Sequence, residues 1–299
     1  MPDHGGVLAR VLRRAGGTEI LDFLADRLPG PDLTTLLLHV MRRRAGRATA
    51  PNVLRQYASD RFTEPAAVPF RELRRTEDVV LSALPDEFEM VTCSPVAPLG
   101  AHSVLATVDQ NKVVSTIRRT EVAADPTNLL ALEAAVRRSR GGPAGCVRLA
   151  TVQRVLRAQR FADPGAQAHF TLFGLVSAGR DTGNLAFERR HAVEHLRFHA
   201  AAAVAAGHRP RVRLTSLGSS VLVPAITKEL PDVAVLADPD RESGRGYYTE
   251  LCFKVDVASS DGWREVADGG FVDWTVRLLG DRKERLLISG VGVDGLAVG

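Results

Sequence analysis

The sequence predicts an α+β fold in which an antiparallel sheet flanked by helices follows an N-terminal helical region. Apolar residues recur at helical spacing through most of the first 60 positions. Apolar and β-branched runs between turn residues dominate the second half instead. The phosphate loop Gly-x-x-x-x-Gly-Lys-Ser/Thr, which follows a strand of a parallel sheet, does not occur. We therefore expect a helical region over 1–66 and a mixed core over 67–299.

The composition is that of an ordinary globular protein, with 45% hydrophobic and 25% charged residues among 299. The formal charge of +4 is compatible with nucleotide or nucleic-acid partners but does not require them. No apolar run approaches the roughly 20 residues that a membrane-spanning helix needs. The N-terminus lacks the basic-then-apolar order of a signal peptide. We expect a soluble cytoplasmic protein without a membrane partner.

The N-terminal region is predicted to contain helices over residues 7–28 and 34–44, separated by Pro29-Gly30-Pro31. The second helix ends in Arg42-Arg43-Arg44, where positive charge is favourable at a helix C-terminus. These arginines and Arg47 can contact phosphate, although a solvated helix end is the simpler interpretation.

Two β-branched runs, 103–108 and 112–117, flank Asp109-Gln110-Asn111 and predict a β-hairpin. The other elements of the core follow from the same periodicities. Strands are expected at 88–93, 146–149, 154–159, 168–175, 212–215, 233–237 and 285–291, and helices at 70–84, 129–140, 187–206, 221–230 and 274–279. Turn residues give further expected breaks, a linker at 141–143 and a loop at Pro164-Gly165.

A glycine-rich turn precedes two adjacent tyrosines, Tyr247 and Tyr248, in a protein that has three tyrosines in all. The segment reads as a strand, so the two side chains are expected to point to opposite faces, one packing and the other lining a pocket. A second glycine pair, Gly269-Gly270, follows close to an aspartate, Asp273. Taken alone, the segment also suits a plain antiparallel hairpin.

The histidines offer no clear site. His191, His195 and His199 recur at i, i+4 and i+8 on one predicted helix face, which suggests a metal ridge. Charged residues surround them, and one helix seldom closes a tetrahedral site without a second element. We therefore favour a solvated helix face and expect no metal site there. His169 lies beside Phe170 in a predicted pocket strand.

Taken together, these segments resemble the catalytic core of class II aminoacyl-tRNA synthetases, from about Phe70 to the end of the chain. The histidyl-tRNA synthetase branch, which includes the regulatory subunit of ATP phosphoribosyltransferase, is the most similar. Its Arg-Gly-Leu-Asp-Tyr-Tyr-Thr-Gly strand resembles the segment with Tyr247 and Tyr248, and its Gly-Gly-Arg-Tyr-Asp loop resembles Gly269 to Asp273. The terminal run 289–296 resembles the third class II motif, Gly-x-Gly-x-Asp-Arg-Leu.

The resemblance implies ATP and Mg²⁺ as cofactors and assigns roles to several side chains. Arg157 falls on the arginine of Arg-x-Glu, which holds the ATP α-phosphate and the substrate carboxylate, and Gln159 falls on the glutamate. A planar guanidinium suits both tasks. Phe170 falls where adenine is stacked. Asp125 and Glu121 are the two rival groups for the substrate ammonium. The implied substrate-binding residues are Glu121, Asp125, Thr127, Arg245, Tyr247, Tyr248, Gly269, Gly270 and Asp273.

Departures from the family pattern affect the phosphate-binding groups. Gly295 replaces the third-motif arginine that clamps the γ-phosphate, and Ser243 replaces the arginine that opens the tyrosine segment. Several cations are candidates for a second clamp: Arg241, Arg245, Arg282, Lys283 and Arg285. We expect no anticodon-binding domain after the core, and for that reason tRNA is not an expected partner.

We thus expect a stand-alone paralogue of the histidyl-tRNA synthetase catalytic domain. It would bind a small amino or carboxylic acid, and ATP, and activate the acid as an acyl-adenylate. The resemblance also implies a homodimer formed through helix 70–84 and strand 88–93. The alternative is a non-catalytic, ligand-sensing regulatory subunit, which the loss of charge at Gly295 favours. A third, weaker possibility is an RNA-binding module that uses the basic N-terminal helices.

Overall fold

The computed structural model describes residues 4–141, 145–160, 167–260 and 262–297. The chain divides into two compact units, one formed by residues 1–60 and 115–120 and the other by residues 61–114 and 121–299. The boundary predicted between residues 66 and 67 stays a prediction. Most of the expected linker at 141–143 and the expected Pro164-Gly165 loop lie outside the described residues.

The N-terminal unit is helical but has no core of its own. None of its described residues between 6 and 60 is fully buried, and Val7, Leu8 and Val11 are each about half exposed. Proline starts two of its helices, because its missing N–H falls where the first turn has no acceptor. The helices are α1 (His4–Ala15), α2 (Glu19–Asp22), α3 (Gly30–Ala45) and α4 (Ala50–Ser59), with a π-helical turn at Phe23–Arg27.

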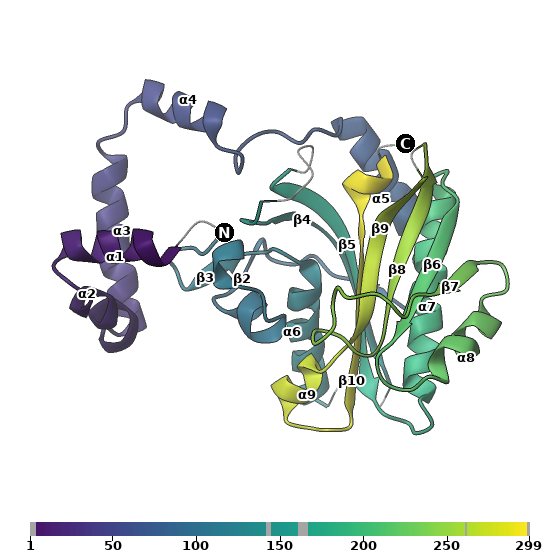
Figure 1. The fold of residues 1–299 in the computed structure, drawn as a ribbon. Coiled ribbons are helices and arrows are strands. Elements are labelled where there is room, and N and C mark those ends of the chain that lie inside the picture. Colours follow the sequence, from purple (N-terminus) through teal and green to yellow (C-terminus); the bar gives the residue numbers. More distant parts are fainter. Residues whose placement is uncertain (1–3, 142–144, 161–166, 261, 298–299) are drawn as a thin grey trace. The chain divides into compact units, whose positions relative to one another are not determined.

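The second unit is built on an eight-stranded sheet whose order is β1-β4-β5-β10-β9-β8-β6-β7 (Figure 1). The two edge pairs, β1 with β4 and β6 with β7, are parallel, and every other pair is antiparallel. The strands are β1 (Glu89–Met90), β4 (Val147–Leu156), β5 (His169–Arg180), β6 (Pro210–Ser216), β7 (Ala234–Ala237), β8 (Thr249–Ser259), β9 (Gly262–Val272) and β10 (Glu284–Gly292). The predicted α+β class with an antiparallel-dominated sheet is therefore confirmed.

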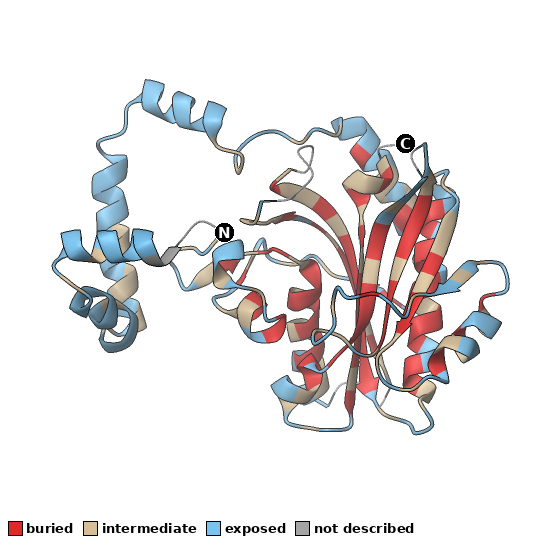
Figure 2. Cartoon of the chain, viewed as in Figure 1, coloured by how far each residue is buried: buried red, intermediate tan, exposed pale blue. Residues whose placement is uncertain are grey.

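Helices cover the two faces of the sheet unequally (Figure 1). One face packs against α7 and α8 through a large apolar cluster that includes Phe173, Leu196 and Phe253. The other face packs against α6 and α9, mainly over β4, β5 and β10. Figure 2 shows the buried residues concentrated on the central strands and on the helices that pack against the sheet. The helices are α5 (Phe70–Ser82), α6 (Pro126–Ser139), α7 (Ala186–Ala205), α8 (Leu222–Glu229), α9 (Trp274–Leu279) and α10 (Val293–Ala297).

The predicted hairpin around Asp109-Gln110-Asn111 is wrong. A π-helical turn, Ala101–Leu105, overlaps the first predicted strand, and a 3-10 turn, Gln110–Lys112, lies between the two. The Asp109 side chain accepts a hydrogen bond from the Asn111 amide at 3.0 Å, which turns the chain before a second strand can pair. Short strands β2 (Val96–Pro98) and β3 (Thr120–Val122) pair nearby in a separate two-stranded sheet.

Other strand predictions were right in position but wrong in length. The strands expected at 146–149 and 154–159 are one strand, β4, so Arg157 and Gln159 lie just beyond its end. The strand expected at 88–93 is reduced to β1, which has two residues. The run from Gly290 to Gly295 also has the spacing Gly-x-Gly-x-x-Gly, but it ends an antiparallel strand and leads into a five-residue helix rather than a βαβ unit.

Candidate functional site

A pocket of about 360 Å³ opens on the sheet face that α6 covers only in part. The residues that form it come from the start of α6, the end of β4, strands β5, β9 and β10, and the segment before β8. They are Asp125, Thr127, Arg157, Phe170, Leu172, Tyr247, Tyr248, Glu265, Val266, Ala267, Asp268, Ile288, Ser289, Gly290 and Gly292. Six of the residues predicted for the site line this pocket.

The start of α6 places Asp125 and Thr127 at one wall of the pocket. Asp125 is the N-cap, and its Oδ1 accepts hydrogen bonds from the Thr127 amide at 2.9 Å and the Thr127 hydroxyl at 2.7 Å. Pro126 packs directly on Gly174 of β5, where an added Cβ would lie 2.8 Å from the proline Cγ. The close approach of α6 to the sheet therefore fixes where the Asp125 carboxylate points.

Arg157 is held beside Asp125 by three contacts. Its Nε donates to the Ala124 carbonyl at 2.9 Å, and its Nη2 lies 3.4 Å from Asp125 Oδ2. The guanidinium carbon lies 5.1 Å from the centre of the Phe170 ring. Arg157 is the only cation among the described residues that line the pocket. The structure thus brings these three predicted site residues together, and a cation–π contact positions the arginine.

Tyr247 and Tyr248 both line the pocket, but they do not lie on a strand. Gly244 and Gly246 adopt positive φ, and the amides of both tyrosines donate to the Gly244 carbonyl, so the pair sits in a tight turn before β8. The two rings meet edge to face with centres 4.6 Å apart instead of pointing to opposite faces. Burial raises the pKa of both phenols, which keeps them neutral hydrogen-bonding groups.

Gly269 and Gly270 lie within β9 rather than in the loop that the family resemblance implies. A Cβ on Gly269 would come within 2.5 Å of the Phe253 ring and of Ser289 Cβ. A Cβ on Gly270 would lie 2.6 Å from the Tyr248 ring. Their role here is to let neighbouring side chains approach the strand, and neither lines the pocket.

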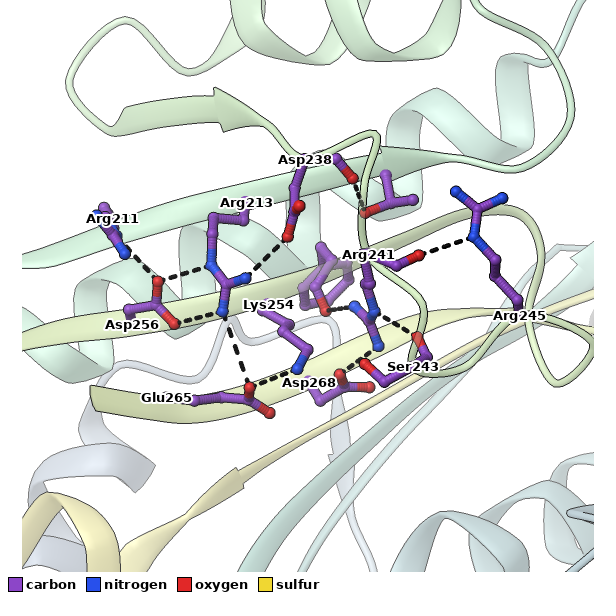
Figure 3. Close-up of polar contacts among 12 residues, drawn as sticks. Arg211, Arg213, Asp238, Arg241, Ser243, Arg245, Lys254, Asp256, Glu265 and Asp268 are labelled. Carbon is purple, nitrogen blue, oxygen red and sulfur yellow. Dashed lines mark hydrogen bonds and ion pairs between the residues drawn. The ribbon is translucent and has the colours of Figure 1, made fainter. Parts of the chain in front are cut away.

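Asp268, one residue before this glycine pair, was not among the predicted site residues. Its Oδ1 accepts a hydrogen bond from the Tyr248 hydroxyl, and its Oδ2 lies 2.6 Å from Nη2 of the buried Arg241 (Figure 3). Arg241 also donates to the Phe253 carbonyl at 3.0 Å and to the Ser243 carbonyl at 2.7 Å. Burial raises the pKa of Asp268, and the Arg241 guanidinium opposes that rise. A carboxylate next to a Gly-Gly pair was the available signal.

Four predicted site residues lie away from the pocket. Arg245 donates to the carbonyls of Arg241 at 2.8 Å and Pro239 at 2.7 Å, and Figure 3 shows it directed away from Asp268. Asp273 starts α9 and pairs with Arg277 at 3.2 Å. The remaining two are Glu121, which is fully buried, and Arg282, which is exposed in the turn before β10.

Glu121 is part of a buried network behind the pocket. Its carboxylate accepts hydrogen bonds from the amides of Gly100 at 3.0 Å and His102 at 2.9 Å, and from the Gln110 side chain at 2.8 Å. Burial alone would raise its pKa, but these hydrogen bonds and one with the His102 ring lower the pKa to about 2. Glu121 is therefore an ionised structural group that anchors the 100–112 segment, and Asp125 is the carboxylate that faces the pocket.

A second cavity, of about 230 Å³, adjoins the first and shares Asp125, Arg157 and Tyr247 with it. We call it the inner chamber. Gln159 lies here rather than in the pocket. The residues that line the inner chamber are His102, Ala106, Val108, Lys112, Ala124, Asp125, Asn128, Arg157, Gln159 and Tyr247.

The three helix histidines are buried, so the predicted solvated face is wrong. His195 hydrogen-bonds the hydroxyls of Ser177 at 3.0 Å and Ser289 at 2.8 Å, and His199 bonds Ser289 at 2.8 Å. Serine hydroxyls of the sheet thus satisfy both ring nitrogens of His195 and one of His199, whose Nδ1 has no hydrogen-bond partner among the described residues. His191 pairs with Glu194 at 2.6 Å. Within the described ranges, no group of three potential ligand side chains could hold a metal ion.

His169 and Gly295 also have defined surroundings. His169 contacts the Arg154 guanidinium at 2.8 Å and the Glu64 carbonyl at 2.6 Å, outside the pocket lining. Gly295 lies in α10, where its carbonyl accepts a hydrogen bond from Arg264 of β9. The neighbouring Asp294 accepts from the Thr171 amide at 2.6 Å, which ties α10 to β5.

Comparison with known proteins identifies the fold. No protein-family model and no curated protein sequence matches the chain. Three similar solved structures are each 14% identical. Apo histidyl-tRNA synthetase from S. aureus gives a TM-score of 0.59 over 76% of this chain and 64% of its own. A Bacillus halodurans protein described as an ATP phosphoribosyltransferase regulatory subunit/histidyl-tRNA synthetase has a TM-score of 0.61. The match covers 79% of this chain and 81% of that protein. A histidine–tRNA ligase subunit from Alicyclobacillus acidocaldarius has a TM-score of 0.59, with 78% of this chain and 94% of that chain covered.

At this identity the likeness shows the fold alone. The chain spans somewhat less than two-thirds of the S. aureus enzyme. In the part of the chain that the structure describes, no helix is long and apolar enough to span a membrane. The second unit thus has the histidyl-tRNA synthetase-like, class II fold that the sequence motifs indicate.

Proposed function

We propose that this chain binds a small amino acid or carboxylic acid together with ATP and activates the acid as an acyl-adenylate. The observation that carries the proposal is the placement of Arg157 between Asp125 and Phe170, in a pocket large enough for a small molecule. Asp125 would accept the ammonium of an amino acid, and Arg157 would bind its carboxylate. The class II fold supports this assignment by analogy.

The reaction would place new charge next to Arg157. A carboxylate oxygen attacks the α-phosphorus, the bond between that phosphorus and its bridging oxygen breaks, and pyrophosphate leaves with the electron pair. The protein supplies position and positive charge at the α-phosphate. Phe170 offers a ring face for adenine. Mg²⁺ is usually held by phosphate oxygens and one or two carboxylates, and Glu265 and Asp268 line the pocket.

Exchange of labelled pyrophosphate into ATP, measured against a panel of amino and carboxylic acids, tests the proposal. The adenylation function predicts exchange that requires one acid or one chemical class of acids. Absence of exchange with every acid, together with thermal stabilisation by an acid in the absence of ATP, would contradict it.

A second candidate function is that of a ligand-sensing regulatory subunit. The observation that favours it is Gly295, which offers no side chain where the family resemblance places a γ-phosphate clamp. Asp125 and Arg157 would then hold an amino acid whose binding regulates a partner enzyme. The exchange assay separates the two functions, because ligand binding without any exchange is the regulatory outcome.

We further propose that the chain forms a homodimer through α5 and β1. Phe70 and Leu81 of α5 and Met90 of β1 expose 75%, 42% and 41% of their surface, respectively. Burial of such side chains would stabilise an interface.

A further inference from the structure

The inner chamber contains a buried amide without a hydrogen-bond partner. Asn128 is 1% exposed, and its Nδ2 has no hydrogen-bond partner among the described residues. Leaving such a group unpaired is destabilising, so a buried amide that faces a cavity is normally satisfied by what occupies the cavity. Asn128 lies in the first turn of α6, whose N-terminus favours negative charge. Both features suit a ligand that accepts hydrogen bonds.

The charges around the inner chamber point the same way. Among the described residues that line it, Lys112 and Arg157 are the cations and Asp125, which Arg157 neutralises in part, is the only acid. No ion pair of Lys112 is found among the described residues. Glu121 is fully buried and occupied by its own network. The chamber therefore has a net positive lining.

His102 contributes less to this balance than its position suggests. Its Nδ1 lies 2.6 Å from Glu121, and its Nε2 accepts the Ala124 amide at 3.0 Å. Both ring nitrogens are therefore already engaged, with the proton on Nδ1. Lys112 and Asn128 are available as donors, together with the side chains of Gln159 and Tyr247.

A ligand held at Arg157 can reach both cavities, because Asp125, Arg157 and Tyr247 line both. We propose that the inner chamber binds the side-chain carboxylate of an acidic amino acid, aspartate or glutamate, and that Asn128 and Lys112 contact it. The α-ammonium and α-carboxylate of the same molecule lie at Asp125 and Arg157. This assignment rests on the proposed function, which it narrows to one class of amino acid.

The test compares L-glutamate, L-glutamine and L-norvaline, three amino acids that share a chain length but differ in the terminal group. Isothermal titration gives the dissociation constants, and pyrophosphate exchange is measured with each. The inner chamber predicts that glutamate binds at least about 10-fold more tightly than norvaline, the effect of one charge-assisted hydrogen bond. Glutamine lies between them. Aspartate is tested in parallel, since a shorter chain also fits the class.

Two variants test the assignment to named residues. Lys112→Gln and Asn128→Leu are each expected to reduce the norvaline-to-glutamate ratio of dissociation constants several-fold. Lys228→Gln, on α8 and away from both cavities, is the matched control and should keep the ratio. If Asn128→Leu fails to fold, Asn128→Ala and Lys112→Gln decide the matter.

The possible failures are distinguishable. If acidic and neutral amino acids bind equally and support exchange equally, the inner-chamber assignment is overturned while the proposed function stands. If glutamate is preferred but neither variant changes the ratio, the residues are wrongly assigned and the inference is also overturned. If no amino acid binds or supports exchange, this inference is overturned, and the proposed function fails as well when no other carboxylic acid does so.

Discussion

Gly270 shows how closely single atoms define the pocket. A Cβ at this position would lie 2.6 Å from the Tyr248 ring and 2.8 Å from Cys252 Cβ. Gly270→Ala should therefore displace Tyr248 and weaken its hydrogen bond to Asp268, with a loss of about 1–3 kcal/mol in the free energy of unfolding. Chemical denaturation and ligand titration measure both effects. Gly145→Ala is the control, because its Cβ would meet nothing within 4 Å. Equal stability of the two variants would contradict the packing argument.

The buried histidines predict a dependence of stability on pH. Burial lowers the pKa of His199 from 6.5 to about 3 and lowers that of His195 as well. In the unfolded chain each takes up a proton below about pH 6.5. The folded chain does not take up these protons. The free energy of unfolding should therefore decrease as the pH is lowered from 6.5 towards 3, by about 1.4 kcal/mol per pH unit per histidine.

Urea unfolding at several pH values between 7.5 and 5 tests this dependence. His199→Gln should give a shallower slope than the wild type, and His39→Gln, at an exposed position of α3, should not change it. A wild-type stability that is constant over this range would show that the two imidazoles titrate normally.

The sequence motifs predicted many of the residues that line the pocket, but the sequence does not show which of these residues contact one another. Asp125, Arg157, Phe170 and the tyrosine pair lie together, although they are up to 123 residues apart in the chain. Asp268 was not predicted because its role depends on Arg241 and Tyr248, which reach it from the connection between β7 and β8. Short-range patterns carry no information about such long-range partners.

At the scale of an element, α6 joins stability and binding in one side chain. Asp125 caps the helix, and asparagine caps nearly as well, so Asp125→Asn should keep most of the stability but lose the charge that attracts an ammonium. Amino-acid affinity should fall about 10-fold or more. Asp125→Ala should lose both affinity and about 1 kcal/mol of stability. Thermal melts and titrations separate the two effects, and an unchanged affinity in Asp125→Asn would rule out an ammonium contact.

Long periodic elements were predictable, whereas short segments were governed by turn chemistry. Helix α7 and strands β5 and β10 appear near their expected positions because their apolar patterns match the sheet and its cover. The tyrosine segment forms a turn because Gly244 and Gly246 take positive φ, which a strand interpretation overlooks. The buried face of α7 was missed because histidine is ordinarily read as polar, and here serine hydroxyls satisfy it.

For the whole molecule, the proposed homodimer predicts twice the chain mass in solution. Light scattering after gel filtration measures it. Leu81→Arg places a charge on the exposed face of α5 and should yield a monomer, whereas Leu278→Arg, at a similarly exposed site on α9, should leave the mass unchanged. A wild-type monomer would contradict the proposal directly.

The N-terminal unit is where the sequence explains least. Its helices were predicted, yet their apolar side chains are largely exposed, so periodicity alone does not show what they pack against. The unit also includes residues 115–120, of which 115–117 were assigned to the predicted hairpin.

The central claim is that Arg157 binds the reacting carboxylate and the α-phosphate. The most direct measurement is the rate of acid-dependent pyrophosphate exchange in Arg157→Ala compared with Arg180→Ala, an exposed arginine that pairs with Asp281. Loss of a preorganised donor at a developing charge should reduce the rate on the order of 100-fold in Arg157→Ala. Arg180→Ala should match the wild type. Equal exchange rates in the two variants would contradict the account.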